Sequence, residues 1–316
     1  MKVLVTGGSG MVGSALASAL TSRQTLTVVS ASRRSGRVRN THTAPMAELA
    51  CRADHGALLS GIDTLYHLAA RVHIMDDPAA DPLTAFREVN TAGTLNLAHQ
   101  AAAAGVRRFV FVSSIKVNGE ATEPGHPFHH DDPPAPQDPY GISKREGEDG
   151  LREIAAATGM EVVIVRPPLV YGPGVKANFA AMMRAVQRGL PLPLGAVTHN
   201  RRSLVALDNL VDLLITCIDH PAAANQTFLV SDGEDLSTAG LLRRLGQAMG
   251  KPARLLPAPP SLLQLGATMV GKRDMAQRLL GNLQVDIDHT RQTLDWTPPI
   301  SVDEGLRRAA AGLTAR

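Results

Sequence analysis

The sequence predicts an α/β fold in which a parallel sheet is covered by helices on both faces, with a smaller lobe at the C-terminal end. Short apolar runs alternate with helical patterns over residues 1–165, and this order is typical of a doubly wound parallel sheet. After residue 168 the alternation becomes irregular. We therefore expect one domain at 1–168 and a second at 169–316, with segments at about 203–230 returning to the first sheet.

Composition narrows the class of protein. The formal net charge of the 316 residues is only +3, and no basic stripe with interleaved aromatic residues suggests a nucleic-acid surface. The two cysteines, Cys51 and Cys217, fit no disulfide or metal framework, which is typical of a reducing compartment. The chain opens without a signal-peptide pattern, and the apolar run Ser261 to Val270 is too short to span a bilayer. We expect a cytoplasmic protein with no metal, no nucleic-acid partner and no membrane insertion.

The first 13 residues, MKVLVTGGSGMVG, combine an apolar run with glycines at three-residue spacing. This pattern predicts a strand, a tight turn and a helix that continues through Leu20. The amides at such a helix N-terminus bind a pyrophosphate, as in Rossmann-type folds. Gly7 permits the turn, Gly10 lets the ligand approach the backbone, and Gly13 lets the helix pack on the strand. We expect the cofactor to contact Gly7, Gly10, Met11, Val12 and Gly13.

The second strand, Thr27 to Ala31, bears on the choice of dinucleotide. A fold that prefers NAD usually places Asp or Glu at its end, for the ribose 2′-hydroxyl. Here Ser32, Arg33 and Arg34 follow, with no acid, and guanidinium groups suit a 2′-phosphate. We expect NADP(H) as the cofactor. NAD(H) is the alternative, in which the arginines belong to a solvated basic loop.

Two further segments bear on the same site. A short third strand is expected at Ala47 to Cys51, and Asp54 after it either accepts a hydrogen bond from adenine or caps a helix near His55. The strand expected at 63–70 contains a core histidine, His67, and ends in small residues that leave room for a cofactor: Leu68, Ala69 and Ala70. Residues 82–104 predict one long helix that Gly105 ends.

Tyr140 and Lys144 lie four residues apart at the start of a helix expected at 141–157, so both side chains share one face. A phenol has a pKa of about 10, and a neighbouring ammonium lowers it, which would let Tyr140 exchange a proton with a hydroxyl or carbonyl group. The alternative is an ordinary exposed helix start. Ser113 and Ser114 close the strand expected at Arg108 to Ser113, at the end of a parallel sheet where ligands bind.

With these elements in place, the sequence resembles the extended short-chain dehydrogenase/reductase family, in its nucleotide-sugar epimerase and reductase branch. The motifs that carry the resemblance are TGGSGMVG at 6–13, HLAA at 67–70, VNTAGTLNL at 89–97, FVSSIKVNG at 111–119, YGISK at 140–144, RPPLVYGPG at 166–174 and RRSLV at 201–205.

The resemblance implies roles for individual residues. Tyr140 would be the acid and base, and Lys144 would lower its pKa and bind the nicotinamide ribose. Ser114 would hydrogen-bond the reacting oxygen. Asn90 and Pro167 join the cofactor set, while Asn178 and Arg202 would hold the diphosphate of a UDP-sugar, with Arg273 as a further, unaligned phosphate ligand. Members of the family often form dimers, so we expect a homodimer.

Departures from the family patterns favour one reaction. Ile115 and Lys116 stand where sugar dehydratases carry an acidic pair, and Asn118 stands where hexose 4-epimerases commonly have tyrosine. Together with the missing acid after the second strand, they favour NADPH-dependent reduction at C4 of a UDP-4-keto-6-deoxy-N-acetylhexosamine for surface polysaccharide. The alternative is a UDP-hexose or UDP-N-acetylhexosamine 4-epimerase. A non-catalytic dinucleotide sensor is a third reading, which the intact Ser-Tyr-Lys set argues against.

Overall fold

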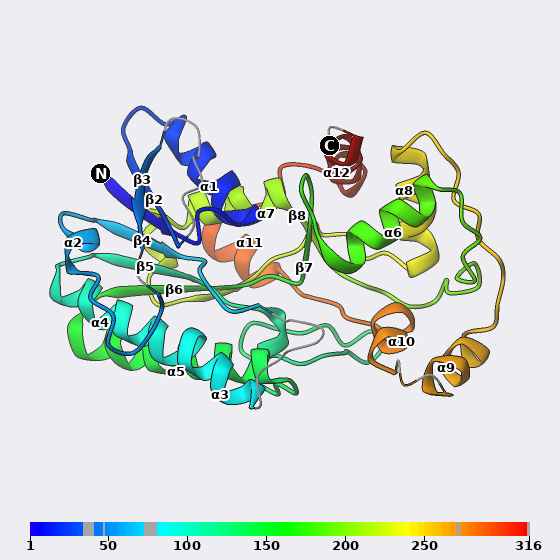
Figure 1. The fold of residues 1–316 in the computed structure, drawn as a ribbon, viewed down its shortest axis with the longest axis horizontal. Coiled ribbons are helices and arrows are strands. Elements are labelled where there is room, and N and C mark those ends of the chain that lie inside the picture. The colour runs from blue at the N-terminus through cyan, green and yellow to red at the C-terminus, as the bar shows by residue number, and fades with distance from the viewer. Residues whose placement is uncertain (34–40, 47, 73–80, 270, 272, 315–316) are drawn as a thin grey trace.

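The computed structural model describes residues 1–33, 41–46, 48–72, 81–269, 271 and 273–314. Seven strands form a parallel sheet in the order β3-β2-β1-β4-β5-β6-β9, which occupies one half of the molecule (Figure 1). Their bounds are β1 Lys2–Thr6, β2 Thr27–Ser32, β3 His42–Pro45, β4 Thr64–His67, β5 Arg108–Val112, β6 Glu161–Arg166 and β9 Thr227–Leu229. The predicted Rossmann-type doubly wound fold is confirmed.

The alternation of side chains along β1 explains why helices cover both faces. Val3 and Val5 point into one apolar cluster, and Leu4 points into another on the opposite face, as the two-residue period of a strand requires. The first face is covered by α1 Met11–Thr21, α7 Leu207–Thr216 and α11 Asp288–Leu294. The second is covered by α2 Gly56–Leu59, α4 Thr94–Ala103 and α5 Pro139–Thr158, and α3 Pro82–Phe86 packs against α5.

The remaining elements build the second lobe, on the right in Figure 1. They are β7 Leu169–Tyr171, β8 Leu204–Ala206, α6 Ala177–Gln187, α8 Thr238–Ala248, α9 Pro260–Met269, α10 Arg273–Leu280 and α12 Val302–Thr314. Single 3₁₀ turns occur at η2 Ile115–Val117 and η3 Pro221–Ala223. This lobe has a core of its own, to which Tyr171, Met183, Leu245 and Leu306 contribute. Within the described residues no helix is long and apolar enough to cross a membrane.

Three segments differ from the expectation. The third strand lies at β3, upstream of Ala47 to Cys51, and residues 48–51 form no strand. β3 is the edge strand of the sheet, its side chains are largely exposed, and it therefore lacks the apolar run that marks a buried strand. The helix expected at 82–104 is interrupted by a π-helical segment, η1 Arg87–Gly93, between α3 and α4.

The segment at 203–230 divides between two sheets. β9 pairs with β6 in the large sheet, whereas β8 pairs with β7 in a separate two-stranded parallel sheet. The expected return to the main sheet thus applies to the strand at 227–229, and it does not hold for the strand at 204–206, which belongs to the smaller sheet. The division into domains at residue 168 stays a prediction.

Candidate active site

The carboxyl ends of four neighbouring strands bring most of the expected site residues to one edge of the sheet. β1 leads into the glycine turn, β4 into residues 68–70, β5 into Ser113 and Ser114, and β6 into Pro167. Because β1, β4, β5 and β6 are neighbours and run parallel, these segments lie side by side. This is the edge at which open α/β sheets bind their ligands.

The glycine turn is shaped for a close approach of backbone to ligand. Gly7 has a φ of +70°, and a Cβ there would come within 2.7 Å of the amide nitrogen of Ala69. A Cβ on Gly13 would come within 2.3 Å of the Gly7 carbonyl oxygen, so this contact between helix and turn requires glycine. Gly10 is the N-cap of α1 and has no side chain to cap it, which leaves the first amides of the helix for an anion. The residues here fit a dinucleotide pyrophosphate.

The basic groups expected to bind a 2′-phosphate at the end of β2 are less suited to it than the sequence predicts, because Arg33 is paired with an acid. The Arg33 guanidinium forms an ion pair with Glu48 at 3.2 Å, and both side chains are about 70% exposed. Ser32 ends the strand, and its carbonyl accepts a hydrogen bond from the amide of Met46. Arg34 lies outside the described residues. The carboxylate of Asp54 accepts from the Gly56 amide at 2.8 Å, which supports its interpretation as a cap of α2.

The segment that follows β4 is fixed by buried polar groups. His67 is fully buried between the hydroxyls of Thr6 and Thr94, at 2.8 and 3.0 Å, and burial lowers its pKa to about 3. It is a neutral core histidine, as expected. Asn90, in the π-helical segment, hydrogen-bonds both backbone groups of Arg71 and the hydroxyl of Ser143. Its amide therefore ties the backbone after β4 to the helix that carries Tyr140.

Tyr140 and Lys144 occupy the first turns of α5, on the opposite side of the sheet from α1. The Lys144 ammonium donates to the Val112 carbonyl at 2.8 Å and lies 4.3 Å above the Phe111 ring, so it reaches the end of β5. Asp138 caps the helix by accepting from the Gly141 amide at 2.7 Å. The Tyr140 ring packs edge-on against Phe86, 6.1 Å away between centroids.

The protonation of this pair differs from the expectation. Burial raises the pKa of Tyr140 to about 12, and Asp138 adds to that rise. Burial also lowers the pKa of Lys144 to about 7, which Glu148 opposes. Removal from water disfavours the phenolate, so the protein's own groups hold Tyr140 in its protonated form. The predicted lowering of its pKa by Lys144 is wrong for these groups by themselves.

The two adjacent serines have different partners. Ser113 donates to Glu148 at 2.6 Å, and Glu148 is fully buried and bound by two nitrogens of Arg166 at 2.9 and 2.6 Å. Ser113 thus links the end of β5 to α5 through Glu148. Ser114 is half-buried at the end of the strand, where its oxygen accepts only a long bond, 3.3 Å, from the amide of Lys116 among the bonds described. This assignment supports Ser114 as the serine available to a substrate oxygen.

A second pocket, in the other lobe, brings together two of the residues expected to bind substrate. Asn178 of α6 and Arg202, just before β8, both line a cavity of about 240 Å³ between α6, α8 and α10. Arg202 is largely buried, and its guanidinium donates to the Gly281 carbonyl at 3.2 Å. Burial and the nearby Arg278 lower the pKa of Arg202, an effect that Glu120 opposes. Two guanidinium groups near one apolar cavity form a site suited to a diphosphate.

Comparisons with known proteins agree with this geometry. The model of the NAD dependent epimerase/dehydratase family matches residues 3–231. A UDP-glucose 4-epimerase of Vibrio cholerae is 51% identical over 308 residues, covering 98% of this chain and 94% of that protein. One of Mycolicibacterium smegmatis is 29% identical and covers 98% and 97%. The chain belongs to the NAD-dependent epimerase/dehydratase family.

Solved structures support the fold of this family member. The UDP-glucuronic acid 4-epimerase of Bacillus cereus in complex with NAD superposes with a TM-score of 0.80, at 20% identity over 100% of this chain and 99% of that one. The UDP-glucose 4-epimerase of Thermotoga maritima with UDP-glucose gives 0.77 at 21% identity, with the same coverage. The match to the family model and to the Vibrio cholerae relative confirms the extended short-chain dehydrogenase/reductase resemblance, and the protein is an enzyme of that family.

Sequence reasoning missed two residues near the candidate site. Arg278 of α10 lines the same cavity as Asn178 and Arg202, whereas Arg273, the arginine considered from sequence, lines another cavity between α9 and α10. They lie five positions apart on α10, and the helical face decides which one faces the pocket. From the sequence, Lys116 was noted only because it stands where a sugar dehydratase carries an acid. In the structure it forms ion pairs with Asp138 and with Glu120, the latter at 2.9 Å. It thereby offsets the charge of the carboxylate that caps the catalytic helix.

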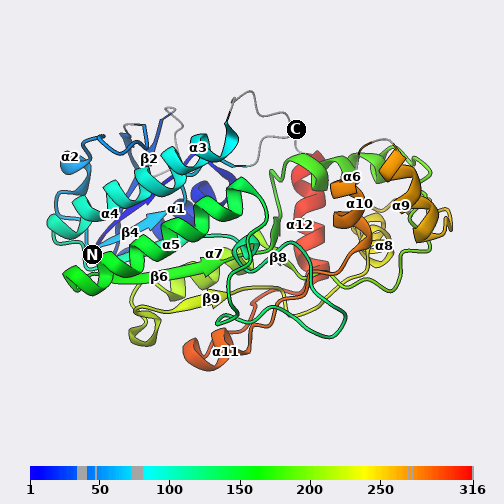
Figure 2. The same cartoon turned by 90° about the horizontal axis from the view of Figure 1, so that it is seen from below.

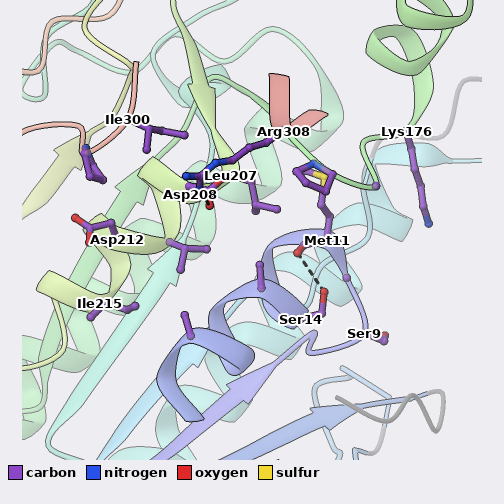
Figure 3. Close-up of a pocket in the computed structure, with 17 residues that line it drawn as sticks. Ser9, Met11, Ser14, Lys176, Leu207, Asp208, Asp212, Ile215, Ile300 and Arg308 are labelled. Atoms are coloured by element: carbon purple, nitrogen blue, oxygen red, sulfur yellow. Dashed lines mark hydrogen bonds and ion pairs between the residues drawn. The ribbon is translucent and has the colours of Figure 1, made fainter. Parts of the chain in front are cut away.

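A further cleft, of about 810 Å³, lies elsewhere. Figure 3 shows it between the start of α1 and α7, with Met11 and Ser14 on one wall and Asp208 and Arg308 on the other. The last two form an ion pair at 2.6 Å. Tyr140, Lys144 and Ser114 do not line this cleft. It borders the back of the glycine turn, on the face of the sheet opposite α5.

Proposed function

We propose that the enzyme is a UDP-hexose 4-epimerase that keeps NAD bound throughout turnover. The observation that carries the proposal is the 51% identity to a UDP-glucose 4-epimerase over nearly the whole of both chains. The sequence alone favoured reduction at C4, with the epimerase as the alternative. The proposal reverses that preference. It is supported by a site that holds Ser114, Tyr140 and Lys144 at the edge of the sheet together with an arginine pocket in the second lobe.

The residues would share the chemistry as follows. Tyr140 takes the proton of the sugar C4 hydroxyl and later returns it, and Ser114 hydrogen-bonds the same oxygen. Lys144, held at the end of β5, binds the nicotinamide ribose. The glycine turn after β1 and Lys144 would hold NAD, which would supply reversible hydride transfer at C4. Its positive nicotinamide ring would favour the phenolate, which the buried protein groups alone disfavour.

The second lobe would hold the part of the substrate that does not react. Arg202 and Arg278 would bind the UDP diphosphate, with Asn178 beside them. The sugar must present both faces to the nicotinamide in turn, so the nucleotide would supply most of the binding energy and the sugar would be free to rotate. The diphosphate keeps its charge throughout the reaction, so its contacts can stay in place while the sugar turns.

C4 reduction with NADPH remains a second candidate because no acid follows β2, where Ser32 and Arg33 stand. The two functions differ in how they treat the cofactor: an epimerase regenerates its NAD, and a reductase must exchange its cofactor at every turnover. The test is to denature the purified protein, identify the released nucleotide, and assay UDP-glucose and UDP-galactose interconversion without added cofactor. Bound NAD and cofactor-independent turnover are expected. An empty site with NADPH consumption on a 4-keto sugar nucleotide would replace the proposal.

A further inference from the structure

Lys116 joins the segment after β5 to the start of α5. Its backbone amide donates to the Ser114 hydroxyl at 3.3 Å, and its ammonium forms ion pairs with Asp138 and, at 2.9 Å, with Glu120. Asp138 is the N-cap of α5 and stands two residues before Tyr140. One residue therefore contacts both the proposed catalytic serine and the cap of the helix that carries the proposed catalytic tyrosine.

The backbone around Lys116 is held against the first turn of α5. A Cβ on Gly141 would come within 3.0 Å of the Lys116 carbonyl oxygen, so this approach depends on glycine. The whole connection, residues 113–138, lies between the sheet and the second lobe (Figures 1 and 2). The side chains of Lys116, Asp138 and Glu120 are only 21%, 22% and 20% exposed. Salt and water therefore screen these charges less than they screen a pair on the open surface.

The Asp138 carboxylate affects Tyr140 in two separate ways. It fixes the start of the helix by accepting from the Gly141 amide at 2.7 Å. Its charge also opposes the phenolate, because burial raises the pKa of Tyr140 to about 12 and Asp138 adds to that rise. The first effect needs only an oxygen, which asparagine would also supply, and the second needs the negative charge. A cation paired with Asp138 leaves the cap in place and offsets its charge.

Other charged groups lie on α5 and on the elements packed against it. Lys144 is one helical turn from Tyr140, but burial lowers the pKa of Lys144 to about 7, so its charge is only partly retained near neutral pH. Further charged groups are directed to other partners or to solvent: Arg71 over the Phe86 ring, Arg87 paired with Glu146, Arg145 paired with Asp149, and Glu88 exposed on η1. Lys116 differs from them because it contacts the cap itself.

We propose that Lys116 is a positioning residue that keeps Tyr140 able to act as a base near neutral pH, by offsetting the charge of the carboxylate that caps its helix. The inference rests on the proposed epimerase reaction, in which Tyr140 must be a phenolate to take the proton of the C4 hydroxyl. Each unit by which Lys116 lowers the pKa of Tyr140 makes the phenolate about tenfold more abundant at a pH below that pKa.

The pH profile of kcat tests the proposal, measured on enzyme that carries its bound cofactor. Lys116→Met removes the charge and keeps a long side chain. The midpoint of the acid limb should rise by about one pH unit, so kcat should fall about tenfold near neutral pH and recover at higher pH. Lys116→Arg, the conservative control, should keep the wild-type midpoint.

Removal of the opposing charge should reverse the effect. Asp138→Asn retains a capping oxygen and should lower the midpoint, and the double variant Lys116→Met, Asp138→Asn should return close to the wild-type midpoint. A merely structural role of Lys116 would lower kcat equally at every pH, and Asp138→Asn would not restore it. The proposal is overturned if Lys116→Met leaves the midpoint unchanged, or if the double variant keeps the shift of Lys116→Met.

The ionisation of Tyr140 can also be followed without turnover, from tyrosinate absorbance. The chain has three tyrosines, and burial raises the pKa of Tyr66 and of Tyr171, which are both fully buried. The first tyrosine to ionise should therefore be Tyr140, and its signal should be absent in Tyr140→Phe. It should appear at higher pH in Lys116→Met and at lower pH in Asp138→Asn; equal titrations would overturn the proposal. If the protein does not interconvert UDP-sugars, the epimerase proposal fails, and this titration still decides the effect of Lys116.

Discussion

At the sheet edge that carries Tyr140, two carboxylates are paired with basic residues of the protein, whereas the cavity between α6, α8 and α10 brings two arginines together. Glu148 is bound by Arg166 and Ser113, and Lys116 pairs with Asp138 beside the catalytic helix. In the pocket, burial and the nearby Arg278 lower the pKa of Arg202, and no described residue that lines it is acidic. If the pocket binds the diphosphate as proposed, the first region is complete within the protein, and the second is completed by an anionic ligand.

This difference predicts how each region responds to mutation. Groups that are paired within the protein stabilise the fold and position the catalytic residues, so their loss should appear in stability or in kcat. Groups that wait for a ligand should change affinity and leave the fold intact. Four substitutions test the distinction, in order of decreasing effect.

Tyr140→Phe should lower kcat by about 10²–10⁴-fold, the range for loss of a general acid and base. The phenol ring and its packing against Phe86 remain, so bound cofactor and melting temperature should not change. The measurement is the rate of sugar nucleotide interconversion together with the cofactor content of the variant. A kcat within a few-fold of wild type would remove Tyr140 from the reaction.

Glu148→Gln should destabilise the protein by about 3–5 kcal/mol, because Arg166 would be left with an uncompensated buried charge. Glu146→Gln is the matched control on the same helix. Glu146 pairs with Arg87 at 2.6 Å, but both side chains are partly exposed, so its loss should cost no more than about 1 kcal/mol. Chemical denaturation measures both. Equal effects of the two substitutions would contradict the distinction between buried and exposed pairs.

The contrast between the two regions also explains what could be predicted from the sequence. The glycine turn and the pair Tyr140 and Lys144 follow local rules, because a tight turn and a helical face are fixed by residues a few positions apart. The pocket combines α6, α8 and α10, which lie far apart in the sequence, so Arg278 could not be distinguished from Arg273 without the structure. The pKa of Tyr140 depends on burial by Phe86 and its surroundings, which no local pattern reveals.

Arg202→Ala should raise KM for the UDP-sugar about tenfold to hundredfold, with a smaller change in kcat. A charge-assisted hydrogen bond contributes about 1.5–3 kcal/mol, and the diphosphate keeps its charge in the transition state. Arg278→Ala should act in the same direction. Arg273→Ala, which alters a different cavity, should leave KM within about twofold. A KM unchanged in Arg202→Ala would show that the pocket does not hold the diphosphate.

Arg33→Ala should have the smallest effect. The guanidinium is exposed and paired with Glu48, so NAD affinity should change by less than about threefold. Calorimetric titration of wild type and variant, after removal of bound nucleotide, gives the comparison for NAD and NADP. A wild-type preference for NADP of tenfold or more that Arg33→Ala erases would restore the 2′-phosphate assignment and favour the reductase.

The central claim is that one bound cofactor removes the hydrogen at C4 and returns it to the same carbon. The direct measurement is to incubate the enzyme with UDP-glucose deuterated at C4, in ordinary water and without added cofactor, and to follow the products by NMR. The account predicts UDP-galactose that keeps the deuterium at C4. Product with hydrogen at C4, or no interconversion unless NADPH is supplied with a 4-keto sugar nucleotide, would contradict it.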